Sequence, residues 1–307
     1  MSKNLENKLA QVAIMYYKQG ISQKDISELL NLSKMTISRM LKKASELKII
    51  TVQIKLPFSL NRIIGERLEK KYQLEEEKII VVKNTEKQKL PYYLAKVGAF
   101  YLGVMDLNNK VIGSGLGETI GTMVGYLTPI KTKNTQIIQL IGGLTEVNNA
   151  NPFTIVQEVC NKFGAKGAFL TSRAIVDNKK IKDSIITSSN IENISLNRND
   201  IAIFGIGLFE RRTFLSPDLI KKEEFEELKR KGAVGDICGH CFNEEGKYIN
   251  SNLEDRLVCM SLKQLKKFKK RIAIGGGKHK VKAIKSILRS GMITTLIVDE
   301  DTAKEII

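Results

Sequence analysis

Apolar residues recur at helical spacing in two short segments near the N-terminus. In the first, over 23–30, they fall at i, i+3 and i+4: Ile26, Leu29 and Leu30. In the second, over 34–47, they again share one face: Ile37, Met40, Leu41 and Ala44. Apolar positions with this period predict two amphipathic helices separated by a short corner.

The residues around this corner are those that begin helices and allow sharp turns. Ser22 and Ser33 precede the two segments and are expected as N-caps, and Asn31 tolerates a left-handed backbone. A helix, a tight corner and a second basic helix form the pattern of a helix-turn-helix motif, which reads DNA. The simpler alternative is a helical hairpin with a solvated basic face, but the mixture of Ser, Thr and Arg favours the DNA reader.

The second helix leaves polar and basic side chains outside its apolar face. In helix-turn-helix proteins, the first residues of this helix reach base edges, and neighbouring basic and hydroxyl groups contact phosphates. The predicted DNA-binding residues are therefore Gln23, Ser33, Lys34, Met35, Thr36, Ser38, Arg39 and Lys42. Residues 49–55 alternate like a strand and predict a short wing, so that residues 1–56 form the DNA-binding domain.

The pattern changes after residue 56. Residues 57–74 predict an amphipathic linker helix that follows Pro57. Beyond it, short apolar runs alternate with helical segments, and these runs lie at 79–83, 110–114, 135–141, 167–175, 200–207, 271–276 and 294–300. Such alternation is typical of a mainly parallel sheet with helices on both faces. We therefore predict a Rossmann-like α/β domain over residues 75–307 that binds an effector.

The composition is strongly basic. The chain carries 50 Lys plus Arg against 33 Asp plus Glu, a net charge of +17, which favours a polyanionic partner such as DNA. Only +6 of this charge lies in residues 1–56, so the excess is spread along the chain. The N-terminus is polar and no apolar run approaches the length of a membrane span, so we expect a cytoplasmic protein without a membrane partner.

Glycines follow four of the predicted strands, at 113–117, 142–143, 205–207 and 275–277. In parallel sheets, ligands bind beyond the carboxyl ends of the strands, where glycine lets a backbone approach and helix N-termini offer N–H groups. Four such loops predict a small-molecule site. A dinucleotide is not the expected ligand. The dinucleotide fingerprint has two residues between its second and third glycines, whereas only one residue separates Gly115 from Gly117.

Five segments carry a more specific signal: IGSGLGET at 112–119, QLIGG at 139–143, FGIG at 204–207, GAVGDICGHCFNEEG at 232–246 and the C-terminal stretch at 275–306. Together with the helix-turn-helix, they make the chain resemble the SorC type of sugar-responsive bacterial transcriptional regulators. This resemblance implies a C-terminal domain with the fold of phosphosugar isomerases and deaminases. It also implies a homo-tetramer, as a dimer of dimers, that binds double-stranded operator DNA near sugar-catabolism genes and responds to a phosphorylated sugar.

The resemblance further implies an effector site. It assigns phosphate contacts to the turn at 117–119, sugar hydroxyls to Asp236, and a cation facing the ligand to Lys280. The predicted effector-binding residues are Gly115, Gly117, Glu118, Thr119, Gly142, Gly143, Gly207, Asp236 and Lys280. Two positions depart from the family: Glu118, whose carboxylate would repel a phosphate by roughly 1 kcal/mol or more at contact, and Ile141, where a polar residue is frequent.

Three other interpretations compete with a sugar-controlled regulator. Residues 238–241 contain a Cys-x-x-Cys pair around His240, but a second pair is missing, so we predict no metal and no cofactor. A phosphosugar isomerase or deaminase with an accessory DNA-binding module would use acids such as Asp106, Asp177 and Asp236. A purely architectural basic protein would bind DNA regardless of sugars. With only two His residues and no carboxylate pair at a telling spacing, we predict a repressor without enzymatic activity.

Overall fold

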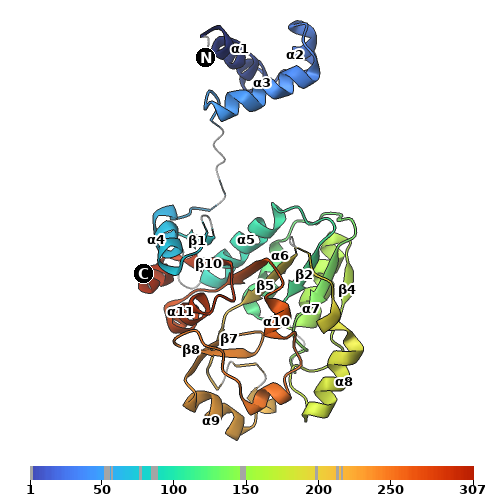
Figure 1. The fold of residues 1–307 in the computed structure, drawn as a ribbon, viewed down its shortest axis with the longest axis vertical. Coiled ribbons are helices and arrows are strands. Elements are labelled where there is room, and N and C mark those ends of the chain that lie inside the picture. The colour runs from blue at the N-terminus through green and yellow to red at the C-terminus, as the bar shows by residue number, and fades with distance from the viewer. Residues whose placement is uncertain are drawn as a thin grey trace. The chain divides into compact units, whose positions relative to one another are not determined.

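The computed structural model describes residues 3–51, 56, 58–75, 78–83, 89–145, 150–197, 200–211, 214–215 and 217–307. The chain divides into two compact units, Met1–Pro57 and Phe58–Ile307. Figure 1 shows the helical first unit and the larger α/β second unit. Among the described residues, none of the helices combines the length and the apolar character that crossing a bilayer requires.

The first unit is built from α1 (Lys3–Ala13), a π-helical turn (Ile14–Lys18), α2 (Gln23–Leu29) and α3 (Lys34–Glu46). Their apolar faces meet in a small core formed by Val12, Ile26, Ile37 and Leu41. The predicted corner is confirmed. Asn31 has a left-handed φ of 52°, and the hydroxyls of Ser22 and Ser33 accept the N–H groups of Asp25 and Thr36 at 3.2 and 3.0 Å.

One sequence prediction for this unit is wrong, and another lies mostly outside the described residues. Leu29 was expected on the buried stripe of the first helix, but its side chain is 65% exposed. The helix α2 ends at this residue, and Ile26 is the residue of the stripe that is fully enclosed. The predicted wing falls largely on residues 52–55, which lie outside the described part of the chain. Of its first residues, Ile50 packs against the small core of the first unit.

The second unit is organised around a seven-stranded sheet with the order β1-β10-β9-β5-β2-β3-β4, and every neighbouring pair in it is parallel. The strands are β1 (Ile79–Val82), β2 (Val111–Ser114), β3 (Gln136–Gln139), β4 (Lys166–Ala168), β5 (Ile201–Gly205), β9 (Lys270–Ile274) and β10 (Thr295–Asp299). Each predicted apolar run overlaps one of these strands, so the predicted parallel α/β fold is confirmed. The run at 167–175 is mostly loop, because β4 is a short edge strand.

Helices cover both faces of this sheet (Figure 1). One face packs in a core with α5 (Leu90–Gly103), α6 (Glu118–Tyr126) and α7 (Pro152–Phe163). The core on the other face includes residues of α4 (Arg62–Tyr72), α9 (Lys222–Arg230), α10 (Leu262–Leu265), α11 (Val281–Arg289) and α12 (Glu300–Ile306). The helix α8 (Lys179–Ser189) lies at the periphery, with Ile185 and Ile186 packed against this second core.

A second, antiparallel sheet was not predicted from the sequence. It joins β6 (Gly207–Leu208), β7 (Ala233–Ile237) and β8 (His240–Asn243) in that order. The strand β7 lies against α11, where the methyl group of Ala283 leaves room only for glycine at position 235, since a Cβ there would come within 2.5 Å of it. This small sheet carries Asp236 and His240.

The predicted linker helix belongs to the second unit. It is α4, which packs on β1 and α12. At Gly65 the helix approaches the β1 backbone so closely that a Cβ would stand 2.6 Å from the Ile79 carbonyl oxygen. Leu68 is fully enclosed, and the Asn61 side-chain amide donates to Glu300 at 3.0 Å. Ile64 and Leu68 of the apolar face therefore dock this helix on the sheet domain, whereas Ile63 is 72% exposed.

Candidate functional site

The predicted DNA-binding residues lie at the start of α2 and on α3. Ser33 and Thr36 fix the beginning of α3, since their hydroxyls are 2.8 Å apart. The other predicted residues of α3 are all exposed: Lys34, Met35, Ser38, Arg39 and Lys42. Gln23, the first residue of α2, is half-buried. Side chains that can reach a groove are thus grouped on the outer side of a helix whose inner face is held by Ile37 and Leu41.

Large apolar side chains also lie exposed around the corner of this motif. Met35 is 64% exposed on the first turn of α3, and Leu32, in the corner itself, is 39% exposed. An apolar side chain at the start of a recognition helix can contact the methyl group of thymine, which distinguishes this base in the major groove. The exposure of Met35 fits base contact better than packing within the unit.

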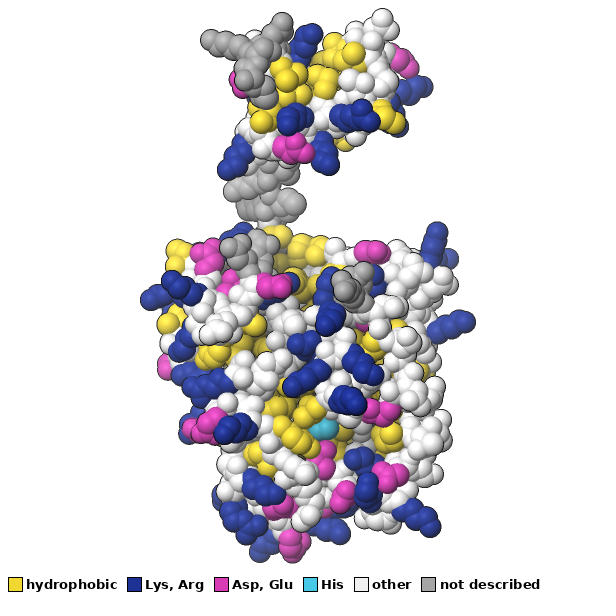
Figure 2. Space-filling view, in the orientation of Figure 1, with side chains coloured by type: hydrophobic (Ala, Val, Ile, Leu, Met, Phe, Trp, Pro, Cys, Tyr) yellow, Lys and Arg dark blue, Asp and Glu magenta, His cyan; other side chains and the backbone are white. Residues whose placement is uncertain are grey.

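On the face that Figure 2 shows, the basic side chains of the described residues alternate with other side chains. Figure 2 shows Lys and Arg spread over the visible faces of both units, interspersed with acidic side chains. The net charge of +17 therefore supplies a diffuse attraction for polyanions. Any sequence specificity has to come from particular side chains such as those of α3.

Three of the glycine-rich loops lie side by side at the carboxyl edge of the sheet, because β9, β5 and β2 are neighbours. A Cβ at Gly115, after β2, would stand 2.8 Å from the Cβ of Phe204. A Cβ at Gly275, after β9, would stand 3.3 Å from the Cβ of Ile206. The structure thus brings together loops that are separated by up to 160 residues in the sequence.

Asp236 and Lys280 meet at this edge. Gly207 of β6 pairs with Asp236 of β7, and a Cβ on Gly207 would fall 1.8 Å from Asp236 Oδ1. Asp236 Oδ2 accepts the N–H of Gly239 at 2.9 Å. Lys280 Nζ donates to the carbonyl of Ile206 at 2.8 Å, which places the ammonium beside the same loop.

The charges of this cluster influence one another. Burial raises the pKa of Asp236 to about 6, although the Gly239 N–H and the Lys280 charge act in the opposite direction. Burial lowers the pKa of Lys280, and the carboxylates of Asp236 and Glu118 oppose that shift. Lys280 therefore interacts electrostatically with both Asp236 and Glu118.

The turn at 117–119 begins α6. Gly117 has a φ of 118°, which favours glycine, and its N–H donates to Ala150 O at 3.1 Å. Glu118 is exposed and Thr119 half-buried, at the positive end of the helix. As at any helix N-terminus, the first amides have no acceptor within the helix, so they can serve an anion or solvent.

Gly142 and Gly143 have a different environment. Their N–H groups donate to Val258 O and Ser172 O, both at 2.8 Å. A Cβ on Gly142 would come within 2.5 Å of the Arg173 carbonyl oxygen. This pair allows two backbone segments to cross, and its amides are engaged within the protein. Ile141, just before it, is fully enclosed and bridges to Cys259.

Two of the three acids considered for catalysis lie elsewhere. Asp106 is exposed in the loop before β2, at the opposite end of the strands, and hydrogen bonds from Asn108 lower its pKa. Asp177 is exposed in the loop before α8. The Cys-x-x-Cys pair consists of free, buried thiols, and within the described residues no group of three or more His, Cys, Asp or Glu is placed to hold a metal.

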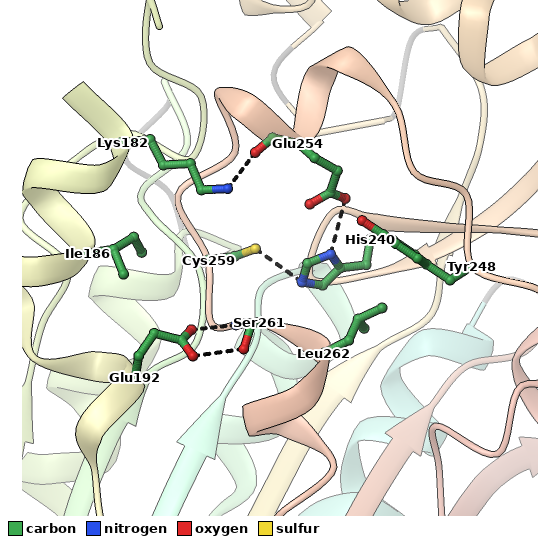
Figure 3. Close-up of a pocket in the computed structure, with 9 residues that line it drawn as sticks. All are labelled: Lys182, Ile186, Glu192, His240, Tyr248, Glu254, Cys259, Ser261 and Leu262. Carbon is green, nitrogen blue, oxygen red and sulfur yellow. Dashed lines mark hydrogen bonds and ion pairs between the residues drawn. The ribbon is translucent and has the colours of Figure 1, made fainter. Parts of the chain in front are cut away.

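A cavity of about 360 Å³ was not anticipated from the sequence. Its lining comprises Lys182, Ile186, Glu192, His240, Tyr248, Glu254, Cys259, Ser261 and Leu262, as Figure 3 shows. These residues come from segments spread over some 80 positions of the sequence. The sequence feature that could have indicated this cavity is His240 within the Cys-x-x-Cys pair. Its partners, Glu254 and Cys259, do not lie at a recognisable spacing from it.

Comparisons with known proteins agree with this architecture. Residues 57–307 match the family described as "Putative sugar-binding domain". The deoxyribonucleoside regulator of Bacillus subtilis is 28% identical over 311 residues, which cover 100% of this chain and 99% of that relative. A transcriptional regulator structure from Streptococcus pneumoniae TIGR4 superposes with a TM-score of 0.72 at 27% identity, covering 80% of this chain and 95% of the other.

A second solved structure extends the similarity of fold to both units. The full-length sorbitol operon regulator SorC from Klebsiella pneumoniae has a TM-score of 0.70 at 22% identity and covers 98% of each chain. A helix-turn-helix unit and a domain of the sugar-binding family define a ligand-responsive transcriptional regulator. The chain belongs to the sugar-binding-domain family of SorC-type regulators, as its sequence segments predicted.

The raised pKa of Asp236 predicts a pH-dependent stability. Its carboxyl titrates near 3.8 when unfolded and near 6 when folded, so the unfolded chain loses this proton first as pH rises. Between about pH 4 and pH 7 the wild type should lose about 3 kcal/mol of unfolding free energy relative to Asp236→Asn, which keeps an oxygen for Gly239. Urea unfolding of both proteins at several pH values measures this difference. A difference that stays constant with pH would contradict the assignment.

Proposed function

We propose that this protein is a repressor whose binding to operator DNA is controlled by a sugar bound at the carboxyl edge of the sheet. The observation that carries this proposal is the cluster of Asp236, Lys280 and the N-terminus of α6 around neighbouring glycine loops. The carboxyl edge of the strands is the usual ligand position in open parallel sheets. Repression is the simplest control, since a bound regulator blocks access to the promoter until an effector releases it.

The chemistry of the cluster favours a polyhydroxylated ligand with one anionic end. A buried carboxylate such as Asp236 suits sugar hydroxyls, while Lys280 and the amides that begin α6 suit a phosphate. The name of one relative, a deoxyribonucleoside regulator, supports the polyhydroxylated part of this proposal. Glu118 is exposed, which lets its carboxylate turn away from an anion.

The effector-binding set that we propose is narrower than the predicted one. It keeps Gly115, Gly117, Thr119, Gly207, Asp236 and Lys280, with Glu118 at the rim. Gly142 and Gly143 contribute through the backbone crossing that they permit, because their amides are engaged by Val258 and Ser172.

We propose a regulator rather than an enzyme. Isomerases and deaminases need a positioned acid and base at the reacting carbons. Of the three candidate acids, only Asp236 lies at the site, whereas Asp106 and Asp177 lie away from it. The relatives are named as regulators, which supports the same conclusion.

Double-stranded DNA and further copies of this chain are the proposed partners. One α3 reads one half-site, and a two-fold operator needs two such helices about one duplex turn, roughly 34 Å, apart. A homo-tetramer would supply two such pairs. The sugar would then act by shifting the population of helix spacings, which requires it to bind one arrangement more tightly than another.

Arg39 provides a test of the DNA-reading surface. Replacing Arg39 with Ala should weaken binding to a DNA site selected by the wild type from random sequence by about 10-fold or more, since one bidentate base contact contributes about 1–3 kcal/mol. Fluorescence anisotropy at fixed salt measures the affinity. Lys43→Ala is the matched control on the same helix, because Lys43 is already paired with Glu46 at 3.6 Å. Equal losses for the two variants would contradict the assignment.

Lys280 provides a test of the effector site. In a thermal-shift screen of sugar phosphates and their unphosphorylated forms, an active compound should raise the Tm of the wild type. Lys280→Met should weaken the binding of that compound about 10-fold or more, because a charge-assisted hydrogen bond contributes about 1.5–3 kcal/mol. Lys282→Met, two residues further on and exposed to solvent, should respond like the wild type. A full response in Lys280→Met would place the site elsewhere.

A further inference from the structure

The cavity in Figure 3 contains a linked series of side chains that the proposed function does not use. Cys259 Sγ lies 3.2 Å from His240 Nε2, and His240 Nδ1 lies 3.2 Å from Glu254 Oε1. A sulfur, an imidazole and a carboxylate in this order form the arrangement by which proteins activate a thiol nucleophile. Cys259 stands at the wall of a cavity large enough for a small molecule.

The hydrogen bonds of His240 determine its charge. Nδ1 faces the Glu254 carboxylate, and Nε2 also lies 3.0 Å from the carbonyl oxygen of Met260. A carbonyl and a carboxylate can only accept, so both ring nitrogens carry a proton and the ring is an imidazolium. Burial opposes this charge, but the Cys259 sulfur and Glu254 outweigh it and raise the pKa of His240 well above its ordinary value.

An imidazolium beside a sulfur has a chemical consequence. Cationic neighbours favour the thiolate form of cysteine, and the thiolate is the nucleophile. The Nε2 proton is shared between the Met260 carbonyl and the Cys259 sulfur. It is therefore available to an oxygen atom that develops negative charge next to the sulfur, as the oxygen of a carbonyl does when its carbon is attacked.

The cavity is distinct from the proposed effector site. In the β7–β8 hairpin, Asp236 is opposite Cys241 and Ile237 is opposite His240. Neighbouring residues of a strand point to opposite faces, so Asp236 and His240 project to different sides of this hairpin. Neither Asp236 nor Lys280 is among the described residues that line the cavity.

The charged groups that face the cavity are already paired. Glu254 is held by His240, and Lys182 Nζ donates to the backbone carbonyl of Glu254. Glu192 accepts the N–H and the hydroxyl of Ser261, both at 2.7 Å. Tyr248 completes the wall next to Glu254, and burial together with that carboxylate raises the pKa of its phenol. Because these charged groups of both signs already have hydrogen-bond partners, the cavity favours an uncharged occupant.

We propose that Cys259 is a reactive thiol that captures a small, uncharged carbonyl compound reversibly in this cavity. The Cys259 thiolate adds to the carbonyl carbon and forms a C–S bond. The π electrons of the carbonyl move to its oxygen, which takes the Nε2 proton of His240. The products are a thiohemiacetal and a neutral imidazole, and no oxidant or reductant is needed. This proposal does not depend on the proposed function.

The other cysteines provide internal controls. Burial raises the pKa of Cys160, and it raises those of Cys238 and Cys241 well above the ordinary value. None of these three lines the cavity. The structure describes all four cysteines as free thiols, so each can be followed separately in one sample.

The test measures alkylation of each cysteine in the folded, full-length protein by iodoacetamide at pH 6.5, with peptide mass spectrometry. Cys259 should react about 10-fold or more faster than Cys160, because the imidazolium of His240 lies beside its sulfur, whereas burial raises the pKa of the Cys160 thiol. His240→Asn should lower the Cys259 rate about 10-fold, and His279→Asn, at the only other histidine, should not change it. Thermal melting, monitored by circular dichroism, verifies that each variant is folded. If His240→Asn does not fold, Glu254→Gln is used in its place.

The ligand class is tested by adding glycolaldehyde or, as a matched compound without a carbonyl, ethylene glycol. Glycolaldehyde should slow alkylation at Cys259 several-fold without slowing it at Cys160, and dialysis should restore the original rate. Ethylene glycol should have no effect. The proposal is overturned if Cys259 reacts no faster than Cys160, if its rate does not depend on His240 and Glu254, or if glycolaldehyde does not protect it.

Discussion

The close approach of backbones at the carboxyl edge of the sheet is the constraint on which the site depends. The strands β2, β5 and β9 are neighbours, and their following loops can meet only because glycine stands at the contact points. A side chain at position 207 would occupy the place of the Asp236 carboxylate, and one at position 115 would collide with Phe204. The same closeness buries Asp236 and Lys280 together, so that each perturbs the pKa of the other.

The alternation of side chains in the β7–β8 hairpin lets the proposed effector site and the cavity lie in one domain. The hairpin of β7 and β8 carries Asp236 on one side and His240 on the other. The first side faces the glycine loops of the parallel sheet, and the second faces the segment that contains Cys259 and Met260. The β7–β8 hairpin therefore places Asp236 in the proposed effector site and His240 in the cavity.

Much of the fold could be predicted from the sequence because it depends on local patterns. Continuous apolar runs identified the strands of the parallel sheet, and Ser22, Ser33 and Asn31 identified the corner of the helix-turn-helix. The strands β7 and β8 were missed, because Gly235, Asp236 and His240 interrupt any apolar run. The docking of α4 and the exposure of Leu29 depend on which surfaces meet, and periodicity does not contain that information.

For the sites too, the sequence indicated the residues that lie in recognisable segments and missed those that depend on tertiary contacts. Asp236 and Lys280 could be named because their segments resemble a known family, and the structure brings them to one edge. The engagement of the Gly142 and Gly143 amides depends on Val258 and Ser172, which are far away in the sequence. The residues that line the cavity likewise come together through tertiary contacts between segments from Lys182 to Leu262. Their spacing in the sequence could therefore not reveal His240, Glu254 and Cys259 as a group.

We propose that this protein couples DNA binding to the occupancy of a sugar site. The most direct measurement is the affinity of the full-length protein for its selected DNA site, determined at fixed salt with and without the compound that stabilises it against heat. Coupling free energies of about 1–3 kcal/mol correspond to a change of about 5- to 150-fold in affinity, and we expect a change in this range. An affinity that is the same with and without the saturating compound would contradict the account.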